Sequence, residues 1–175
     1  IPFVTVRAVD AAGEPVPAGD DGELQIRGPN VSPGYTDAAK NEGVFLPGGW
    51  LASGDVGQVD AQGRLYVTGR AKDMIITGGF NVYPSEVEAV LRLHPGVRDA
   101  AVVGVMHPES GSEEVVAGIV LDPGAQLDPQ SIHDHARESL TAYKVPRRYV
   151  VLDELPVNAM GKVLRREVVR EIRGR

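Results

Sequence analysis

The arrangement of apolar and polar residues changes character close to residue 70. Short alternating segments separated by glycine-containing turns come before it and are typical of strands. We expect these strands at residues 3–9, 23–27, 56–59 and 64–68. The sequence DAQG at residues 60–63 predicts a hairpin connection, and residues 37–42 predict one helical turn. Regular strands with few helices indicate a small β-rich subdomain.

Beyond residue 73, apolar strands alternate with segments of helical periodicity. Helices are expected after Pro84, after Asp128-Pro129 and around Leu164, because apolar residues spaced three or four apart follow each position. The first helix is expected to end at Pro95-Gly96. Strands are expected at residues 74–77, 97–106, 115–121 and 148–152. The middle two are almost continuously apolar, which implies that both of their faces are buried.

These patterns predict an α+β fold in two parts. Residues 1–71 are expected to form the β-rich subdomain. Residues 72–175 are expected to form a compact α+β domain with a short central sheet flanked by helices. Because the chain opens on Ile-Pro-Phe within a strand-like pattern, we expect its natural amino terminus to lie further upstream.

Composition narrows the classes of function. The 175 residues are 42% hydrophobic and 24% charged, which is ordinary for a globular protein. A formal net charge of -6 and a pI of about 5.2 argue against nucleic-acid binding, which depends on basic surface. The absence of cysteine excludes disulfides, a thiol nucleophile and cysteine-ligated zinc. No apolar run approaches the ~20 residues of a membrane helix and no signal peptide is recognisable, so a cytoplasmic location is expected.

Positive charge is concentrated toward the carboxyl-terminal end. The basic residues from Tyr143 onward are Lys144, Arg147, Arg148, Lys162, Arg165, Arg166, Arg170, Arg173 and Arg175. Such a concentration in an acidic chain suggests an anionic ligand at this end. The alternative is a solvated helix face on which Arg166 and Arg170 pair with nearby glutamates.

Three motifs carry the chemistry. Residues 50–57 read WLASGDVG, residues 69–88 read GRAKDMIITGGFNVYPSEVE, and residues 156–167 read PVNAMGKVLRRE. In content, order and separation they resemble the adenylate-forming (AMP-binding) superfamily of acyl-CoA synthetases, peptide-synthetase adenylation domains and luciferases. The resemblance covers nearly the whole chain and is to the carboxyl-terminal part of such an enzyme. It implies that residues 1–71 complete a large domain and that residues 72–175 form a mobile one.

The resemblance implies two half-reactions. A carboxylate attacks the α-phosphorus of ATP and gives acyl-AMP and pyrophosphate, and a thiol, usually that of CoA, then displaces AMP. Both reactants of the first step are anionic, so a flexible cation that touches both is a suitable catalyst. Lys162 takes this catalytic role by its match to the family motif. The alternative is an exposed lysine in a loop before a helix.

The resemblance also implies a nucleotide site and a hinge. Asp55 would accept hydrogen bonds from both ribose hydroxyls, and Arg70 would contact the ribose or a phosphate. The alternatives are an aspartate in a glycine turn, and a surface salt bridge between Arg70 and Asp73. Lys72 and Asp73 match the hinge about which the mobile domain swings between the half-reactions.

A third set of residues is implied to receive CoA. Gly78 and Gly79 match the segment that lines the tunnel for the thiol arm, and they equally suit a two-residue hairpin turn. Tyr143 would stack on adenine, and Lys144, Arg147 or Arg148 would pair with phosphates. The alternative is a basic loop beside a strand. Many relatives carry a Trp-Gly pair where this chain reads PESGSEE, at residues 108–114.

The implied ligands are ATP, Mg²⁺ that arrives with ATP, and CoA as co-substrate. The implied partners are these small molecules and a carboxylate, with no nucleic acid and with a homo-oligomer left open. We expect no metal site built from protein side chains, because the four histidines show no metal-like arrangement with acidic residues.

The leading hypothesis is an acyl-CoA ligase for a fatty or related carboxylic acid, because YKVPRR, LDELP and NAMGKVLRRE resemble bacterial ligases of this kind. The alternatives are an adenylation domain or acyl-AMP ligase that loads a carrier protein, and a non-catalytic binding module. Alone, these residues are expected to be inactive, because the family's phosphate loop and acyl pocket lie elsewhere. Residues 73–175 are nevertheless expected to fold by themselves.

Overall fold

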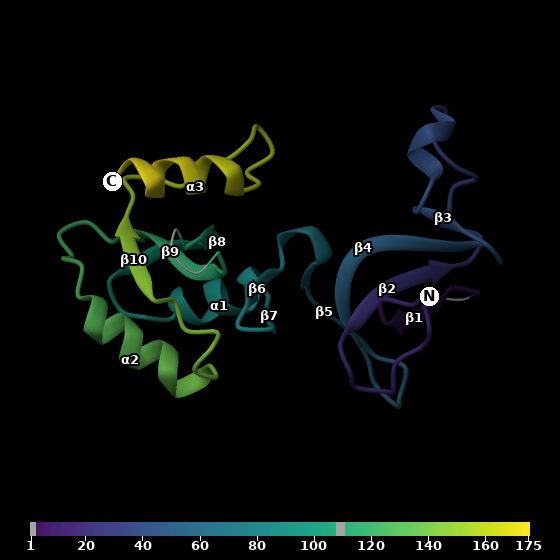
Figure 1. The fold of residues 1–175 in the computed structure, drawn as a ribbon, viewed down its shortest axis with the longest axis horizontal. Coiled ribbons are helices and arrows are strands. Elements are labelled where there is room, and N and C mark those ends of the chain that lie inside the picture. The colour runs from purple at the N-terminus through teal and green to yellow at the C-terminus, as the bar shows by residue number, and fades with distance from the viewer. Residues whose placement is uncertain (1–2, 108–110) are drawn as a thin grey trace. The chain divides into compact units, whose positions relative to one another are not determined.

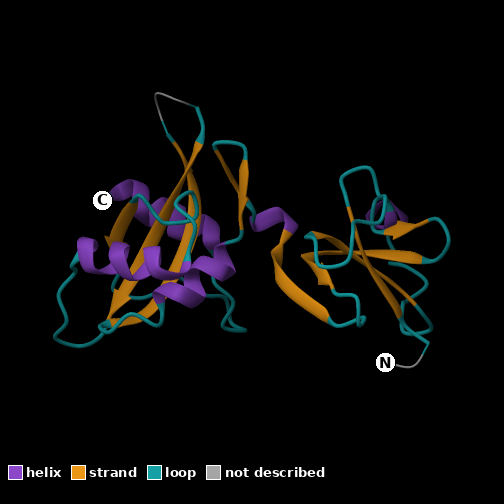
Figure 2. Cartoon of the chain, turned by 90° about the horizontal axis from the view of Figure 1, so that it is seen from below, coloured by secondary structure: helices purple, strands orange, loops and turns teal. Residues whose placement is uncertain are grey.

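The computed structural model describes residues 3–107 and 111–175, so the first three residues of PESGSEE lie outside the described part. The chain divides into two compact units, Ile1–Lys72 and Asp73–Arg175 (Figure 1). Strands dominate the first unit, and the second combines strands with helices, so the predicted α+β class is confirmed (Figure 2).

The first unit is an antiparallel sheet. Its elements are β1 (Thr5–Val9), β2 (Gly22–Arg27), the 3-10 turn η1 (Ala38–Asn41), β3 (Phe45–Leu46), β4 (Trp50–Val59) and β5 (Leu65–Arg70). The strand order is β1-β2-β4-β3, and β5 also pairs with β4. Val9, Leu24 and Val56 are buried in this unit. The predicted β-rich subdomain is present, and the helical turn expected at residues 37–42 is η1.

Asp60 explains why DAQG connects β4 to β5 as a hairpin. Its backbone N–H donates to the carbonyl oxygen of Arg64 at 3.0 Å. Its carboxylate accepts the backbone N–H groups of Gln62 at 2.9 Å and Arg64 at 2.8 Å. The backbone hydrogen bond from Arg64 is the main cause that lowers the pKa of Asp60.

The second unit contains a small hairpin, a central sheet and helices. Its elements follow the 3-10 turn η2 (Ala71–Asp73) and are β6 (Ile75–Thr77), β7 (Phe80–Val82), α1 (Pro84–Leu91), β8 (Val97–Met106), β9 (Glu113–Leu121), α2 (Pro129–Ser139), β10 (Arg148–Val151) and α3 (Arg165–Gly174). The central sheet has the order β10-β9-β8. Strands β8 and β9 are antiparallel, and β10 is parallel to β9.

Helices cover both faces of this central sheet, with α1 and α2 on one face and α3 on the other (Figure 1). Successive side chains of β8 alternate between the two apolar clusters. Ala100 and Val102 pack with the first two helices, and Ala101 and Val103 pack with α3. The predicted burial of both strand faces is therefore confirmed.

The helix ends follow local rules except at the end of α1 and at the start of α3. Asp128 caps α2 as predicted, because its carboxylate accepts the backbone N–H groups of Gln130 and Ser131 at 3.1 Å. Helix α1 ends at Leu91, before the expected Pro95-Gly96, because the backbone N–H groups of Leu93 and His94 bond three residues back and tighten the chain. Helix α3 starts at Arg165 without a capping side chain. Within the described residues, no helix is long and apolar enough to cross a membrane.

Candidate functional site

Asp55 and Arg70 face each other across neighbouring strands of the first unit. A regular hairpin around DAQG would place Asp55 opposite Gly69, but a register shift after Val56 places it opposite Arg70. The Arg70 Nε lies 2.8 Å from the Asp55 Oδ1. The two side chains are 48% and 31% exposed, so a ligand can reach both.

The backbone around Asp55 is fixed by its neighbour Ser53. The Ser53 hydroxyl donates to the carbonyl oxygen of Leu24 at 2.7 Å and accepts the backbone N–H of Asp55 at 3.1 Å. Asp55 therefore lies inside β4 and not in the glycine turn that was the alternative interpretation. The alternative partner of Arg70 is also wrong, because Arg70 pairs with Asp55, whereas Asp73 lies 3.6 Å from Arg165.

Lys162 lies in a closed loop of the second unit, which we call the lysine loop (residues 156–164). Its two sides are joined where Leu164 N–H donates to the Pro156 carbonyl oxygen at 2.8 Å and Asn158 N–H donates to that of Lys162 at 2.9 Å. The Asn158 side-chain oxygen also accepts the backbone N–H groups of Met160 and Lys162, at 3.0 and 2.9 Å. Gly161 makes this turn possible with a φ of 76°. The lysine side chain is thus exposed on an ordered backbone.

The residues predicted to form the hinge differ in their surroundings. Lys72 is exposed within η2, at the end of the first unit. Asp73 begins the second unit, is half-buried, and is 3.6 Å from Arg165 of α3. Whether the chain bends at this point stays a prediction.

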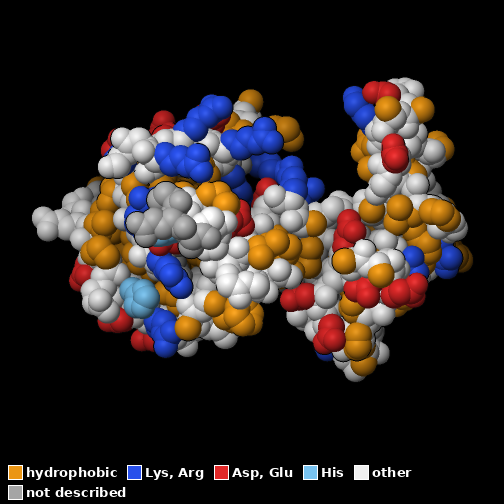
Figure 3. All heavy atoms as spheres, viewed as in Figure 1, with side chains coloured by type: hydrophobic (Ala, Val, Ile, Leu, Met, Phe, Trp, Pro, Cys, Tyr) orange, Lys and Arg blue, Asp and Glu red, His pale blue; other side chains and the backbone are white. Residues whose placement is uncertain are grey.

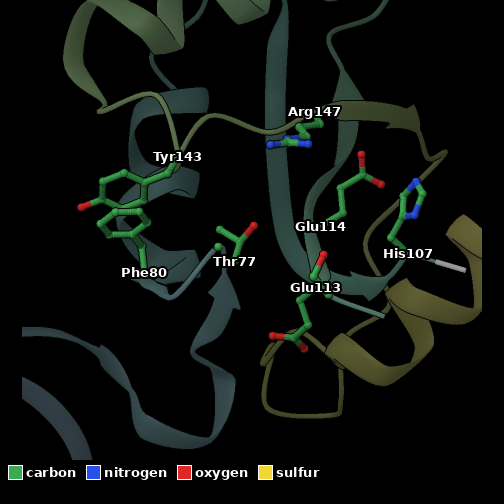
Figure 4. Close-up of a pocket in the computed structure, with 9 residues that line it drawn as sticks. Thr77, Phe80, His107, Glu113, Glu114, Tyr143 and Arg147 are labelled. Atoms are coloured by element: carbon green, nitrogen blue, oxygen red, sulfur yellow. The ribbon is translucent and has the colours of Figure 1, made fainter. Parts of the chain in front are cut away.

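A pocket of about 430 Å³ lies beside the β6–β7 hairpin (Figure 4). Its lining residues are Thr77, Gly78, Phe80, His107, Ser112, Glu113, Glu114, Tyr143 and Arg147. Three of the residues predicted to receive CoA, Gly78, Tyr143 and Arg147, are therefore brought together here. The volume is within the ~300–1,000 Å³ that is usual for small-molecule sites.

The hairpin turn at Gly78-Gly79 shapes one edge of the pocket. Both glycines have positive φ angles, 56° and 82°, as a two-residue turn of this kind requires. The backbone N–H of Ile76 donates to the Glu113 carboxylate at 2.8 Å and fastens the hairpin to β9. The hairpin interpretation is confirmed, and the tunnel role of the glycines stays a prediction.

An aromatic stack forms one wall of the pocket. The rings of Phe80 and Tyr143 lie 4.5 Å apart between centroids at an interplanar angle of 17°. Both side chains remain exposed, at 53% and 37%. Figure 4 shows this stack on one side of the pocket and Glu114 and His107 on the other. The stack provides a flat apolar surface of the type on which a nucleobase can lie.

Lys144 and Arg148, which were also predicted to contact CoA, are not among the residues that line the pocket. The Lys144 ammonium donates to both carboxylate oxygens of Glu86, at 2.7 and 2.8 Å. Arg148 begins β10 and has an exposed side chain. The pocket itself places Glu113 and Glu114 near Arg147, so a phosphate there would meet charges of both signs.

Basic side chains gather over α3 and the lysine loop (Figure 3). Exposed members of this group are Lys162, Arg166, Arg170 and Arg173. Arg170 pairs with Glu167 at 2.7 Å, one turn apart, so the predicted solvated helix face accounts for part of the charge.

Histidine and carboxylate side chains are the groups of this chain that could bind a metal ion. In residues 3–107 and 111–175, no group of three histidine, aspartate or glutamate side chains could hold a metal ion. The Nε2 of His94 lies 2.9 Å from the Ser131 hydroxyl, and its ring meets that of His135 edge-on at 5.4 Å. These histidines are thus engaged in helix packing.

Comparison with known proteins identifies the family. Residues 86–162 match the AMP-binding enzyme C-terminal domain. The chain therefore contains the C-terminal domain of an AMP-binding enzyme. It is 41% identical over 175 residues to a long-chain-fatty-acid–CoA ligase of Escherichia coli O6:H1 (strain CFT073), covering 100% of this chain and 31% of the ligase. It is 44% identical over 160 residues to a 2-succinylbenzoate–CoA ligase of Geobacillus kaustophilus (strain HTA426), covering 91% of this chain and 32% of that ligase.

A solved structure agrees with this assignment. The crystal structure of ATP-bound MatB from Rhodopseudomonas palustris has a TM-score of 0.88 and 38% identity, and the match covers 98% of this chain and 34% of MatB. The chain spans about a third of the length of the relatives it matches. The CoA ligases among them are acid–thiol ligases.

Sequence reasoning missed several residues of this AMP-binding family member that shape its site. Phe80 follows the glycine pair and could have been recognised as an exposed aromatic at a turn. Asn158 could have been recognised as a turn-capping residue four positions before Lys162. Glu88 and Arg165 gave no local signal, because they are 77 residues apart in the sequence.

Proposed function

We propose that the whole protein is an AMP-forming acyl-CoA ligase that acts on a fatty or related carboxylic acid in the cytoplasm. The observation that carries the proposal is the exposed Lys162 on an ordered loop within the matched family domain. The paired Asp55 and Arg70 add support from the first unit. Relatives that are named CoA ligases favour CoA as the acceptor.

In the first half-reaction, a carboxylate oxygen bonds to the α-phosphorus of ATP while the bond from that phosphorus to pyrophosphate breaks. Both reactants are negatively charged, and charge builds up on the phosphoryl oxygens. The Lys162 ammonium would stabilise this charge and hold the two reactants together. Mg²⁺ would arrive with ATP and offset charge on its phosphates.

Asp55 and Arg70 would hold the nucleoside end of ATP. A carboxylate can accept two hydrogen bonds at once, so Asp55 suits the adjacent ribose hydroxyls. Arg70 would orient that carboxylate through the 2.8 Å contact and donate its remaining N–H groups to ribose or phosphate oxygens. The half-exposed state of the pair supports this role.

In the second half-reaction, the CoA sulfur bonds to the acyl carbon while the bond from that carbon to AMP breaks. The thiol proton is released, and AMP leaves. The stacked Phe80 and Tyr143 would support the adenine of CoA, Arg147 would pair with a phosphate, and Gly78-Gly79 would border the thiol arm. For Lys144 to join them, its ion pair with Glu86 must open.

We further propose that the second unit swings about Lys72 and Asp73 between the two half-reactions. Lys72 is exposed at the boundary between the units, which supports a pivot there. The chain alone is expected to be inactive, because it spans only about a third of its relatives.

The function is tested with the full-length protein. AMP release from ATP is followed with aliphatic carboxylates of several lengths and with aromatic carboxylates, each with and without CoA. Turnover that depends on CoA for one group of acids is the expected result and would name the acid. Pyrophosphate exchange without stimulation by CoA would instead favour loading of a carrier protein, and no reaction with any acid would favour a non-catalytic module.

A further inference from the structure

Helix α3 begins against the usual preferences for a helix start. Its N-cap position is Leu164, whose side chain makes no capping hydrogen bond. Arg165 and Arg166 occupy the first turn, where the helix dipole disfavours positive charge and favours only the acidic residue that follows them, Glu167. Some other interaction must therefore hold the helix start, which comes only three residues after Lys162.

Arg165 provides that interaction. Its Nη1 donates to the Glu88 Oε1 at 2.5 Å and to the carbonyl oxygen of Val102 at 2.8 Å. Its Nε lies 3.6 Å from the Asp73 Oδ2. The Glu88 carboxylate, only 7% exposed, also accepts the backbone N–H of Val102 at 2.8 Å. One guanidinium thus joins α3 to α1, to β8 and to the first residue of the unit.

The lysine loop is attached directly to this anchor. Val163 packs against the apolar cluster beneath α3, and Leu164 closes the loop on Pro156 at 2.8 Å. Asn158 fixes the other side of the loop, because its side-chain oxygen accepts the backbone N–H groups of Met160 and Lys162. A shift of the helix start would therefore move the backbone of Lys162.

We propose that Arg165 is a positioning residue for Lys162. Its buried pair with Glu88 fixes the start of α3 and thereby the place of the lysine loop. The inference rests on the proposed function, because it assigns Arg165 to the half-reaction in which Lys162 acts. Arg165 itself does not need to touch a substrate.

The test removes both charges of the Arg165–Glu88 pair together. Breaking such a pair from one side is strongly destabilising, whereas replacing both partners with neutral groups is usually tolerated. The variant is Glu88→Gln with Arg165→Met in the full-length protein, since glutamine keeps an acceptor for Val102 N–H. The matched control is Glu167→Gln with Arg170→Met, which removes an exposed pair from the same helix.

Four quantities are measured on both double variants. They are acyl-AMP formation, thioester formation from supplied acyl-AMP, the melting temperature, and the rate at which a lysine-specific protease cuts after Lys162. Lys162→Ala is the benchmark for the two half-reactions. For the Glu88/Arg165 variant we expect acyl-AMP formation to fall about 10- to 100-fold, as for a misplaced catalytic group. We expect unchanged thioester formation and faster cleavage, and no effect in the control.

Two results would overturn the inference while Lys162→Ala still abolishes acyl-AMP formation. One is unchanged acyl-AMP formation in the Glu88/Arg165 variant. The other is an equal loss in both half-reactions together with a lower melting temperature, which would make Arg165 purely structural. If Lys162→Ala itself keeps acyl-AMP formation, the proposed function fails, and the cleavage rate still reports whether Arg165 orders the loop.

Discussion

Two arginine–carboxylate pairs in this chain have short contacts but different surroundings. Arg70 and Asp55 meet at 2.8 Å, with side chains 48% and 31% exposed. Arg165 and Glu88 meet at 2.5 Å, with side chains 24% and 7% exposed. The first pair is joined by neighbouring strands, and the second joins elements far apart in the sequence.

This difference in burial suits the two ion pairs to different roles. Water already solvates the exposed pair, so its groups can exchange partners with a ligand at low cost. The carboxylate of the buried pair has lost its water and depends on its protein partners. The same chemical pairing therefore suits ligand binding in the first unit and structural support in the second.

The largest effect is expected from breaking the buried pair from one side. Glu88→Ala leaves Arg165 and the Val102 N–H without their shared carboxylate, and we expect the free energy of unfolding to fall by about 3 kcal/mol. Urea unfolding of the chain measures it. Glu167→Ala, on the exposed face of α3, should cost less than ~1 kcal/mol. Equal losses in the two variants would contradict the distinction between buried and exposed pairs.

A smaller effect on stability but a clear one on binding is expected for the exposed pair. Asp55→Ala should change the unfolding free energy by less than ~1 kcal/mol. In the full-length protein it should weaken ATP binding about tenfold or more, because hydrogen bonds to a charged group are lost. Asp37→Ala, which removes another exposed pair, serves as the control.

An analogue without ribose hydroxyls sharpens this prediction. Full-length wild type should bind 2′,3′-dideoxy-ATP more weakly than ATP, as measured by calorimetry. The Asp55→Ala variant should bind both nucleotides with similar affinity. A variant that still prefers ATP would show that Asp55 does not contact the ribose.

The smallest effect concerns a neutral buried group. Within the described residues, the Tyr149 hydroxyl has no hydrogen-bond partner, and burial together with the charge of Asp134 raises its pKa to about 12. The pKa of Tyr149 in the unfolded chain is near 10. The stability that its neutral hydroxyl contributes to the folded state is therefore fully present below pH 10 and is lost as the pH rises toward 12.

Tyr149→Phe tests this assignment by unfolding at pH 8 and at pH 11. The variant should be as stable as the wild type at pH 8, since no hydrogen bond is removed. It should lose less stability than the wild type on going to pH 11. An equal loss would place the alkaline sensitivity in another group.

Local signals in the sequence predicted the secondary structure well. Asp128 caps α2, Pro84 starts α1, and the apolar run at residues 97–106 is a buried strand. The end of α1 was misplaced because a tight turn replaces its last expected residues. Such an exchange between helical and 3-10 bonding leaves no sign in the apolar periodicity.

Long-range pairing was less predictable. Arg70 faces Asp55 only because a bulge shifts the strand register by one residue. Phe80 and Tyr143 are stacked although the chain between them forms most of the second unit. The Lys144–Glu86 ion pair, with a sequence separation of 58, likewise depends on packing. The family motifs predicted Lys162 as the catalytic residue, whereas only the structure shows how Asn158 and Arg165 hold its loop.

The most direct test of the account is to replace Lys162 with alanine in the full-length protein and to measure the two half-reactions separately. The account predicts that acyl-AMP formation falls by about 100-fold or more, the size expected when one charge-stabilising group is removed. Thioester formation from supplied acyl-AMP should stay close to wild type, and the exposed-lysine control Lys40→Ala should be normal in both. Normal acyl-AMP formation by the Lys162→Ala variant would contradict the catalytic role of Lys162.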